Sequence, residues 1–300
     1  RDRLRSRGLG DVYKRQGGNI PDYERQLERA VKWYADLGIH NLKTGYAGGI
    51  SGGNNHHGQY MVRHYQHVVE TAAKYRMTVN AHEPIKDCGI RRTWPNMMSR
   101  EGARGKEWDA WSAGNPPSHE VTLPFTRLLA GPMDFTPGSM FSAQPEDNRS
   151  TGANPMGTGT RAYQMALYVV FESPLQMLAD NPVLYRREHP CTEFLAAVPT
   201  TWDSLRVLHA ACGREVVVAR RKGDKWYVGG ITNDRPYTTE IALDFLPAGR
   251  TFTMTSFEDG VNADLQATDY RKRVREVDAS TVVKAVSYTH LRAHETGAYL

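Results

Sequence analysis

The stretch MVRHYQHVVETAAKYRMTVNAH, residues 61–82, places a predicted helix directly before a predicted strand. We expect the helix over Met61–Tyr75 and the strand over Met77–His82. The same order occurs just upstream, where Tyr23–Leu37 has apolar residues at i, i+3, i+4 and i+7, and a short strand, Asn41–Tyr46, follows. Helices that alternate with short strands are typical of parallel β/α units, so the first half of the chain is predicted to be α/β.

Further along, Pro132–Gly138 and Ser173–Leu178 are predicted as two more strands, with a helix over Arg161–Phe171 before the second of them. In parallel β/α units the function-bearing side chains lie at the carboxyl ends of the strands. Beyond Cys212 the pattern changes to alternating apolar and polar residues between turns, which indicates an antiparallel β domain. The residues expected at the strand ends are Lys43, His82, Glu83, Asp134 and Gln176.

The two ends of the chain are encoded by what reads as one inverted DNA element. Reverse translation of DVYKRQ, residues 11–16, gives a sequence whose reverse complement encodes VSYTHL, residues 286–291. We therefore expect residues 1–16 and 286–300 to be adaptor-like sequence that takes no part in the fold. Residues 17–205 are then predicted to form the catalytic region and residues 206–285 the C-terminal β domain.

Charge and composition exclude several partners. Residues 1–16 carry six Lys and Arg against two Asp, which is +4 of the formal net charge of +5, so the remainder gives no support for a nucleic-acid partner. No apolar run approaches the roughly 20 residues that cross a bilayer. The three cysteines form no CxxC pair, so neither a disulfide framework nor a zinc site is indicated.

The segment NAHEPIKDCGIRRTWPNMMSREGARGKEW, residues 80–108, collects three glutamates, Glu83, Glu101 and Glu107. Gly102 and Gly105 argue against one continuous helix through the last two. Paired carboxylates supply the acid and the base or nucleophile in most glycosidases, and oxygen-rich clusters suit calcium. The alternative is that these are solvated loop charges that pair with nearby arginines, namely Arg91, Arg92, Arg100 and Arg104.

Other side chains near this segment have two interpretations each. Lys43 either bonds a sugar hydroxyl or forms a salt bridge, and His82 either acts beside Glu83 or packs in the core. Trp108 is expected to contact sugar through its ring face, and so is Trp111, whereas Trp94 is expected in the core. An alternative of another class is a metal-dependent amidohydrolase, with the three imidazoles as ligands, His56, His57 and His82.

Long motifs in fixed order resemble glycoside hydrolase family 97 over nearly all of residues 17–286. They are NAHEPIKDCGIRRTWPN, SREGARGKEW, LPFTRLLAGPMDFTPG and ALYVVFESPLQMLAD. The resemblance implies the C-terminal half of a (β/α)8 barrel followed by a small antiparallel β-sandwich domain. It also implies a periplasmic or secreted enzyme that acts on α-linked gluco-oligosaccharides, although the chain carries no signal peptide.

The resemblance also assigns roles. Glu107 would be the general acid, Glu83 would activate the attacking water, and Glu83, Glu101 and Glu107 would hold calcium. Retaining members place a nucleophilic Asp where this chain has Gly45, and they tend to have glycine where it has Glu83. A glycine cannot attack an anomeric carbon, so the resemblance favours the inverting branch, an α-glucosidase.

Inverting relatives carry a second base glutamate about eight residues before the tyrosine that is Tyr23 here, which corresponds to Arg15. Arg15 lies in the adaptor-like segment. We therefore expect glutamate at this position in the natural gene and expect this chain alone to be inactive. The alternative function is that of a non-catalytic fragment or a carbohydrate-binding module.

Overall fold

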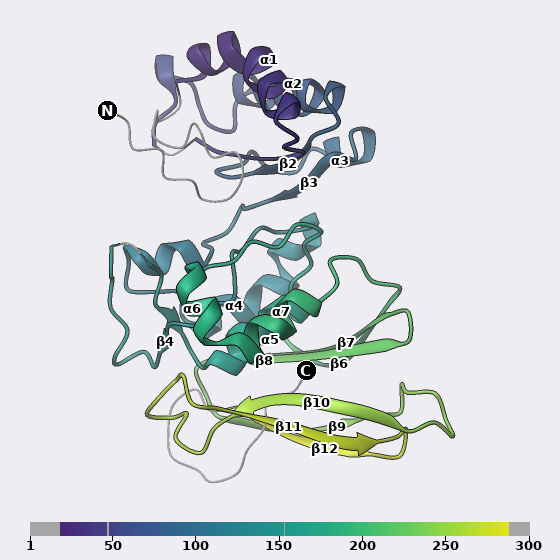
Figure 1. Cartoon of the computed structure of the whole chain (residues 1–300). Coiled ribbons are helices and arrows are strands. Elements are labelled where there is room, and N and C mark those ends of the chain that lie inside the picture. Colours follow the sequence, from purple (N-terminus) through teal and green to yellow (C-terminus); the bar gives the residue numbers. More distant parts are fainter. Residues whose placement is uncertain (1–18, 47, 153, 288–300) are drawn as a thin grey trace. The chain divides into compact units, whose positions relative to one another are not determined.

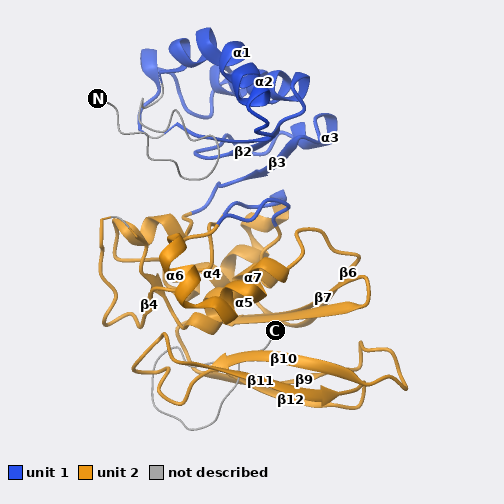
Figure 2. Cartoon of the chain, viewed as in Figure 1, with its two compact units in different colours: residues 1–103, 130–134, 173–177 blue, residues 104–129, 135–172, 178–300 orange. Residues whose placement is uncertain are grey.

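The computed structural model describes residues 19–46, 48–152 and 154–287 (Figure 1). The predicted adaptor-like segments and Arg15 lie outside these residues, apart from 286 and 287. The chain divides into two compact units (Figure 2). Unit 1 comprises residues 1–103, 130–134 and 173–177, and unit 2 comprises residues 104–129, 135–172 and 178–300. The predicted boundary between residues 205 and 206 lies within unit 2 and stays a prediction.

Unit 1 is a three-stranded parallel sheet with helices, as the alternating pattern predicts. Its strands pair in the order β1-β2-β3, and Lys43 on β1 lies opposite Asn80 on β2. The elements in chain order are α1 (Ile20–Asp36), β1 (Asn41–Thr44), η1 (Ser51–Gly53), α2 (Gln59–Lys74), β2 (Thr78–Ala81), α3 (Ile90–Thr93) and β3 (Met97–Arg100).

Helix α1 begins where Asn19 caps it, because the Asn19 side chain accepts a hydrogen bond from the backbone N–H of Asp22. The face predicted from its spacing is the buried one: Leu27, Val31 and Tyr34 are buried in the core of unit 1, and Ala30 is half-buried. Helix α2 and strands β1 to β3 contribute the rest of this core. Packing of the apolar helix faces therefore fixes the sheet whose strand ends carry the candidate site.

Unit 2 combines short helices with antiparallel strands. Its first part holds η2 (Lys106–Ala110), α4 (Pro117–Thr122), η3 (Leu123–Phe125), β4 (Ser142–Ala143), β5 (Gly157–Thr158), α5 (Arg161–Val170), α6 (Pro182–Arg187) and α7 (His189–Ala197). A further short helix, η4 (Arg127–Ala130), spans the boundary between the two units. Every residue of α5 is buried, and this helix packs on β8 (Lys225–Thr232).

The C-terminal β region is antiparallel, as the alternation beyond Cys212 predicts. Strands β6-β7-β8 form one sheet, and β9 with β12 and β10 with β11 form two-stranded sheets. The bounds are β6 (Ser204–Ala211), β7 (Glu215–Lys222), β9 (Tyr237–Ala242), β10 (Phe252–Asp259), β11 (Tyr270–Val277) and β12 (Val282–Ser287). An α/β fold with a C-terminal β-sheet domain is thus observed, whereas the half-barrel and the sandwich stay predictions.

Two of the predicted strands are wrong. Residues 132–138 contribute one isolated parallel bridge, between Met133 and Arg100, and residues 173–178 form no strand. Conversely, β3 lies in the glutamate-rich segment that shows no clear periodicity. Among the described residues, no helix is both long and apolar enough to cross a bilayer.

Candidate active site

Polar side chains gather at the carboxyl ends of the parallel strands of unit 1, and Asp134 is at their centre. Its Oδ2 atom lies 3.2 Å from Lys43 Nζ and 2.5 Å from His82 Nε2. Asn80 Nδ2 donates to the same oxygen at 2.6 Å. All four side chains are buried. Lys43 therefore forms the salt bridge that was one of its two interpretations, and its contact with sugar stays a prediction.

The charge balance of this cluster favours an ionised Asp134. Burial alone would raise the pKa of the Asp134 carboxyl, but the Lys43 ammonium and the hydrogen bonds from His82 and Asn80 outweigh burial and hold that pKa well below its usual value. A permanently charged carboxylate orients His82 through Nε2. The other ring nitrogen, Nδ1, lies 3.6 Å from Glu101 Oε1, so His82 stands between two carboxylates.

Glu83 follows His82 with an unusual backbone. Its φ angle is 40°, in the left-handed region that non-glycine residues seldom adopt. Three contacts hold it there: its N–H donates to Glu101 Oε2 at 3.1 Å, and its carbonyl accepts from the Tyr65 hydroxyl at 2.5 Å and contacts His56 Nε2. Strained backbone of this kind persists where surrounding contacts enforce it, and it concentrates at functional sites.

Gly45, at the end of β1, makes room for the Glu83 side chain. A Cβ atom at position 45 would lie 2.1 Å from Glu83 Oε2 and 2.7 Å from His82 Cβ. Gly45 does not have a positive φ, so its backbone conformation suits any residue and only the lack of space requires glycine. A side chain at position 45 and the observed placement of Glu83 therefore exclude each other.

Glu107 and Trp108 lie in unit 2, on the short helix η2. Glu107 is 9% exposed and accepts a hydrogen bond from the Thr136 hydroxyl at 3.3 Å. Thr136 has a φ of 56°, which is unfavourable for a β-branched residue. Trp108 is 40% exposed, beside the half-exposed Trp111, and Arg104 lies over its ring. The structure thus leaves the Trp108 ring accessible, as sugar contact requires.

The predicted site residues are therefore divided between the units. Glu83, Glu101, His82 and Lys43 come together in unit 1, whereas Glu107 and Trp108 belong to unit 2. Gln176 lies in unit 1, outside any strand. Asp134 was expected at a strand end, but no role was assigned to it from the sequence. Asn80 and Thr136 were missed, although a polar Asn80 inside the otherwise apolar strand is a signal that the sequence contains.

Metal-ligand predictions find partial support in this geometry. Glu83 Oε2 is buried and makes no hydrogen bond among the described residues, which suits an oxygen that binds a cation. Within the same ranges, no group of three or more His, Cys, Asp or Glu side chains is arranged to hold a metal ion. This arrangement gives no support to the amidohydrolase alternative. Trp94 packs against the core of unit 1, as expected.

Two family models match the chain. One, described as glycoside hydrolase 97, matches residues 12–103, and the other, described as the glycosyl-hydrolase 97 C-terminal, oligomerisation domain, matches residues 201–290. Among curated proteins, a "Retaining alpha-galactosidase" from Bacteroides thetaiotaomicron is 38% identical over 251 residues, which cover 83% of this chain and 37% of that protein. A "Probable retaining alpha-galactosidase" from Streptomyces bingchenggensis is 31% identical, over 80% of this chain and 34% of its own length.

Solved structures agree with these matches. A glycoside hydrolase family 97 enzyme from Pseudoalteromonas sp. strain K8, in complex with panose, is 37% identical with a TM-score of 0.82, and the match covers 94% of this chain and 46% of that one. The chain thus spans less than half the length of the relatives it matches. Both terminal matches and the long overlap identify one family, and the chain belongs to glycoside hydrolase family 97.

Proposed function

We propose that the full-length protein to which this chain belongs is an inverting α-glucosidase that hydrolyses α-linked gluco-oligosaccharides. Glu107 is the general acid that protonates the leaving oxygen, and Glu83 accepts a proton from the attacking water. In an inverting enzyme the two carboxyl groups act from opposite faces of the sugar, about 6.5–9.5 Å apart. The activity is proposed for the full-length protein, because this chain covers less than half of its relatives.

One observation carries the inverting assignment: Glu83 fills the space beside Gly45. A retaining mechanism needs a nucleophilic side chain on the protein, and the family resemblance places that nucleophile at position 45. Here a Cβ at that position would meet the Glu83 carboxylate. The left-handed backbone at Glu83 also suits the glycine that retaining members tend to have there, so a glutamate at this strained position has a cost that a function would justify.

Substrate preference rests on weaker support. Relatives in the Pseudoalteromonas structures were solved with panose and with acarbose, which supports a gluco-configured substrate. The curated relatives are instead named for retaining α-galactosidase activity. We give more weight to the Gly45 and Glu83 geometry for the stereochemical course, because that geometry is a property of this chain.

The product configuration tests the proposal directly. A water attack assisted by Glu83 gives the β-anomer from an α-glucoside, whereas a covalent intermediate would give the α-anomer. We expect ¹H NMR of the first minutes of hydrolysis by the full-length protein to show β-glucose before mutarotation. Initial release of the α-anomer would contradict the inverting assignment.

Replacement of Glu107 tests the acid. In the full-length protein, Glu107→Gln should lower kcat on alkyl glucosides and maltose by about 10²–10⁴-fold, the usual contribution of general acid catalysis. Glucosyl fluoride and activated aryl glucosides need little protonation of the leaving group, so they should retain much more activity. Equal losses on both substrate classes would exclude Glu107 as the acid.

Calcium is proposed as a cofactor, with Glu83 and Glu101 as the dominant ligands and Glu107 as a weaker one. Calcium binds six to eight oxygen ligands, so waters and substrate would complete the site, and a bound cation would balance the carboxylates. We expect exhaustive chelation to abolish activity of the full-length protein and calcium to restore it better than magnesium or zinc does. Full activity after chelation would remove calcium from the proposal.

A further inference from the structure

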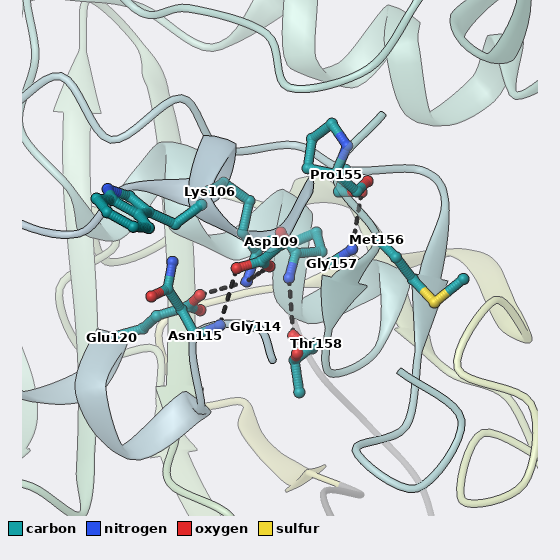
Figure 3. A network of polar contacts seen from close by, with 12 residues as sticks. Lys106, Asp109, Gly114, Asn115, Glu120, Pro155, Met156, Gly157 and Thr158 are labelled. Carbon is teal, nitrogen blue, oxygen red and sulfur yellow. Dashed lines mark hydrogen bonds and ion pairs between the residues drawn. The ribbon is translucent and has the colours of Figure 1, made fainter. Parts of the chain in front are cut away.

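Three fully buried charged side chains surround the backbone of Glu107. Lys106, Asp109 and Glu120 each have no exposed side-chain surface. The Lys106 ammonium lies 3.2 Å from Asp109 Oδ2 and forms a short contact with Glu120 Oε1. Figure 3 shows the three side chains pointing toward one another, with Asn115 beside them. All of these residues belong to unit 2.

This cluster fixes the short helix that carries Glu107. Lys106 and Asp109 belong to η2, and Glu120 belongs to α4, so the ion pairs join the two helices. Asn115 extends the connection: its N–H donates to Asp109 Oδ1 at 2.8 Å, and its side-chain amide donates to the Gly105 carbonyl at 2.7 Å. A helix of five residues has too few hydrogen bonds of its own to hold a side chain in place.

The segment that carries Thr136 is tied to the same point. The Lys106 N–H donates to the Phe135 carbonyl at 2.8 Å, and Thr136, the next residue, donates its hydroxyl to Glu107. A Cβ at Gly105 would lie 2.8 Å from the Phe135 carbonyl oxygen, so this close approach depends on glycine. Glu107 is thus held by contacts on its N-terminal neighbour, on its side chain and on Asp109 two residues later.

Stability alone does not account for three buried charges here. Desolvation of ions is costly, and apolar residues of similar volume often give equal or greater stability than a buried ion pair. Directional ion pairs do fix geometry, and a shift of about 1 Å in a catalytic group can lower a rate by about 10²-fold.

We propose that Lys106, Asp109 and Glu120 position the general acid, with Glu120 the residue that fixes η2 against α4. The inference rests on the proposed role of Glu107. None of the three contacts substrate in this account: they act through Glu107 and are positioning residues. Their loss should therefore impair proton donation to the leaving group more than substrate binding.

The test is Glu120→Gln in the full-length protein, compared with Glu107→Gln. Glutamine keeps the shape of the side chain and removes its charge. We expect kcat on alkyl glucosides and maltose to fall by about 10²-fold, glucosyl fluoride hydrolysis to fall by less than about fivefold, and KM to change little. Such dependence on the leaving group is not produced by a general loss of folded enzyme, which would lower both rates equally.

Glu258→Gln is the matched control. Glu258 is also fully buried and lies in unit 2, where it pairs with three arginines of β11, Arg271, Arg273 and Arg275. We expect this variant to lower the thermal unfolding temperature without changing the ratio of the two rates. If Glu120→Gln behaves like Glu258→Gln while Glu107→Gln shows the leaving-group effect, the positioning role is wrong and the proposed function stands.

A second variant covers the case in which Glu120→Gln fails to fold. The triple variant Lys106→Met, Asp109→Asn, Glu120→Gln removes all three charges together and leaves none unpaired, so it should fold. Selective loss of activity on alkyl glucosides in this variant supports the inference. Unchanged rates on both substrate classes would overturn it. If Glu107→Gln itself shows no leaving-group effect, the proposed function fails first.

Discussion

Gly45→Ala is expected to lower kcat of the full-length protein by at least about 10²-fold, within the range that general base catalysis contributes. The added methyl group would lie 2.1 Å from Glu83 Oε2, well inside van der Waals contact, and 2.7 Å from His82 Cβ. Glu83 has little freedom to yield, because Glu101, Tyr65 and His56 hold its backbone at a φ of 40°. The carboxylate must therefore move from the position where it accepts a proton from water.

Gly49→Ala provides a matched control in the same loop. A Cβ at Gly49 would meet nothing within 4 Å, and Gly49 does not have a positive φ. We expect this variant to keep near-normal kcat and KM on maltose. Both variants should be compared by steady-state kinetics and by thermal unfolding. A Gly45→Ala enzyme with undiminished kcat would show that Glu83 does not act from its observed position.

Hydrophobic periodicity was enough to predict much of unit 1. The apolar faces of α1 and α2 and the strands that follow them were located within a few residues, because burial of one helix face leaves a clear 3.6-residue pattern. Strand β3 was missed because it is four residues long and ends in Arg100, so no alternation is visible. Strand β11 was missed for a similar reason, since YRKRVREV is dominated by charged residues.

Two predicted strands failed because an apolar run does not specify its backbone. In residues 132–138 the chain makes a single bridge and then turns at Thr136, whose positive φ is incompatible with a strand. Nothing in PMDFTPG indicates that a β-branched residue adopts this conformation. The contact with Glu107, 29 residues earlier in the chain, is one of the interactions found at this position.

The candidate site was predictable by position and not by pairing. The strand-end rule named Lys43, His82 and Asp134, but the choice of Asp134 as their shared partner depends on the register that sets Lys43 opposite Asn80. The buried cluster around Glu107 was not predicted at all. Lysine is almost never fully buried without a partner, so Lys106 was passed over as a surface charge.

Asp134→Asn is expected to destabilise the protein by about 3–5 kcal/mol, the usual cost of removing one partner of a buried ion pair. Asparagine has nearly the same volume and keeps one oxygen, so the change isolates the charge. Without that charge, the Lys43 ammonium is left in a site where it is only 6% exposed, and His82 loses its anionic partner. For a unit of this size each kcal/mol corresponds to about 2–4 °C in Tm.

The control for this variant is Asp36→Asn, which removes an ion pair of unit 1 that is exposed to solvent. Lys32 Nζ lies 2.7 Å from Asp36 Oδ2, but both side chains are more than half exposed, and such pairs contribute less than about 1 kcal/mol. Denaturant unfolding of the full-length protein should therefore show a large loss for Asp134→Asn and almost none for Asp36→Asn. Equal losses would mean that the Lys43, His82 and Asp134 cluster does not stabilise unit 1 through charge.

The pH dependence of stability provides a second measure of the same charge. Because the folded pKa of Asp134 is depressed, its contribution is present above the ordinary pKa of 3.8 and is lost as pH falls through the lower folded value. The wild-type protein should thus lose stability on acidification below about pH 4, and Asp134→Asn should lose less over the same range. The double variant Lys43→Met, Asp134→Asn should recover part of the stability at neutral pH, because it removes the unpaired ammonium as well. Failure of that recovery would indicate that the cost of Asp134→Asn arises from lost hydrogen bonds to His82 and Asn80 and not from the buried charge of Lys43.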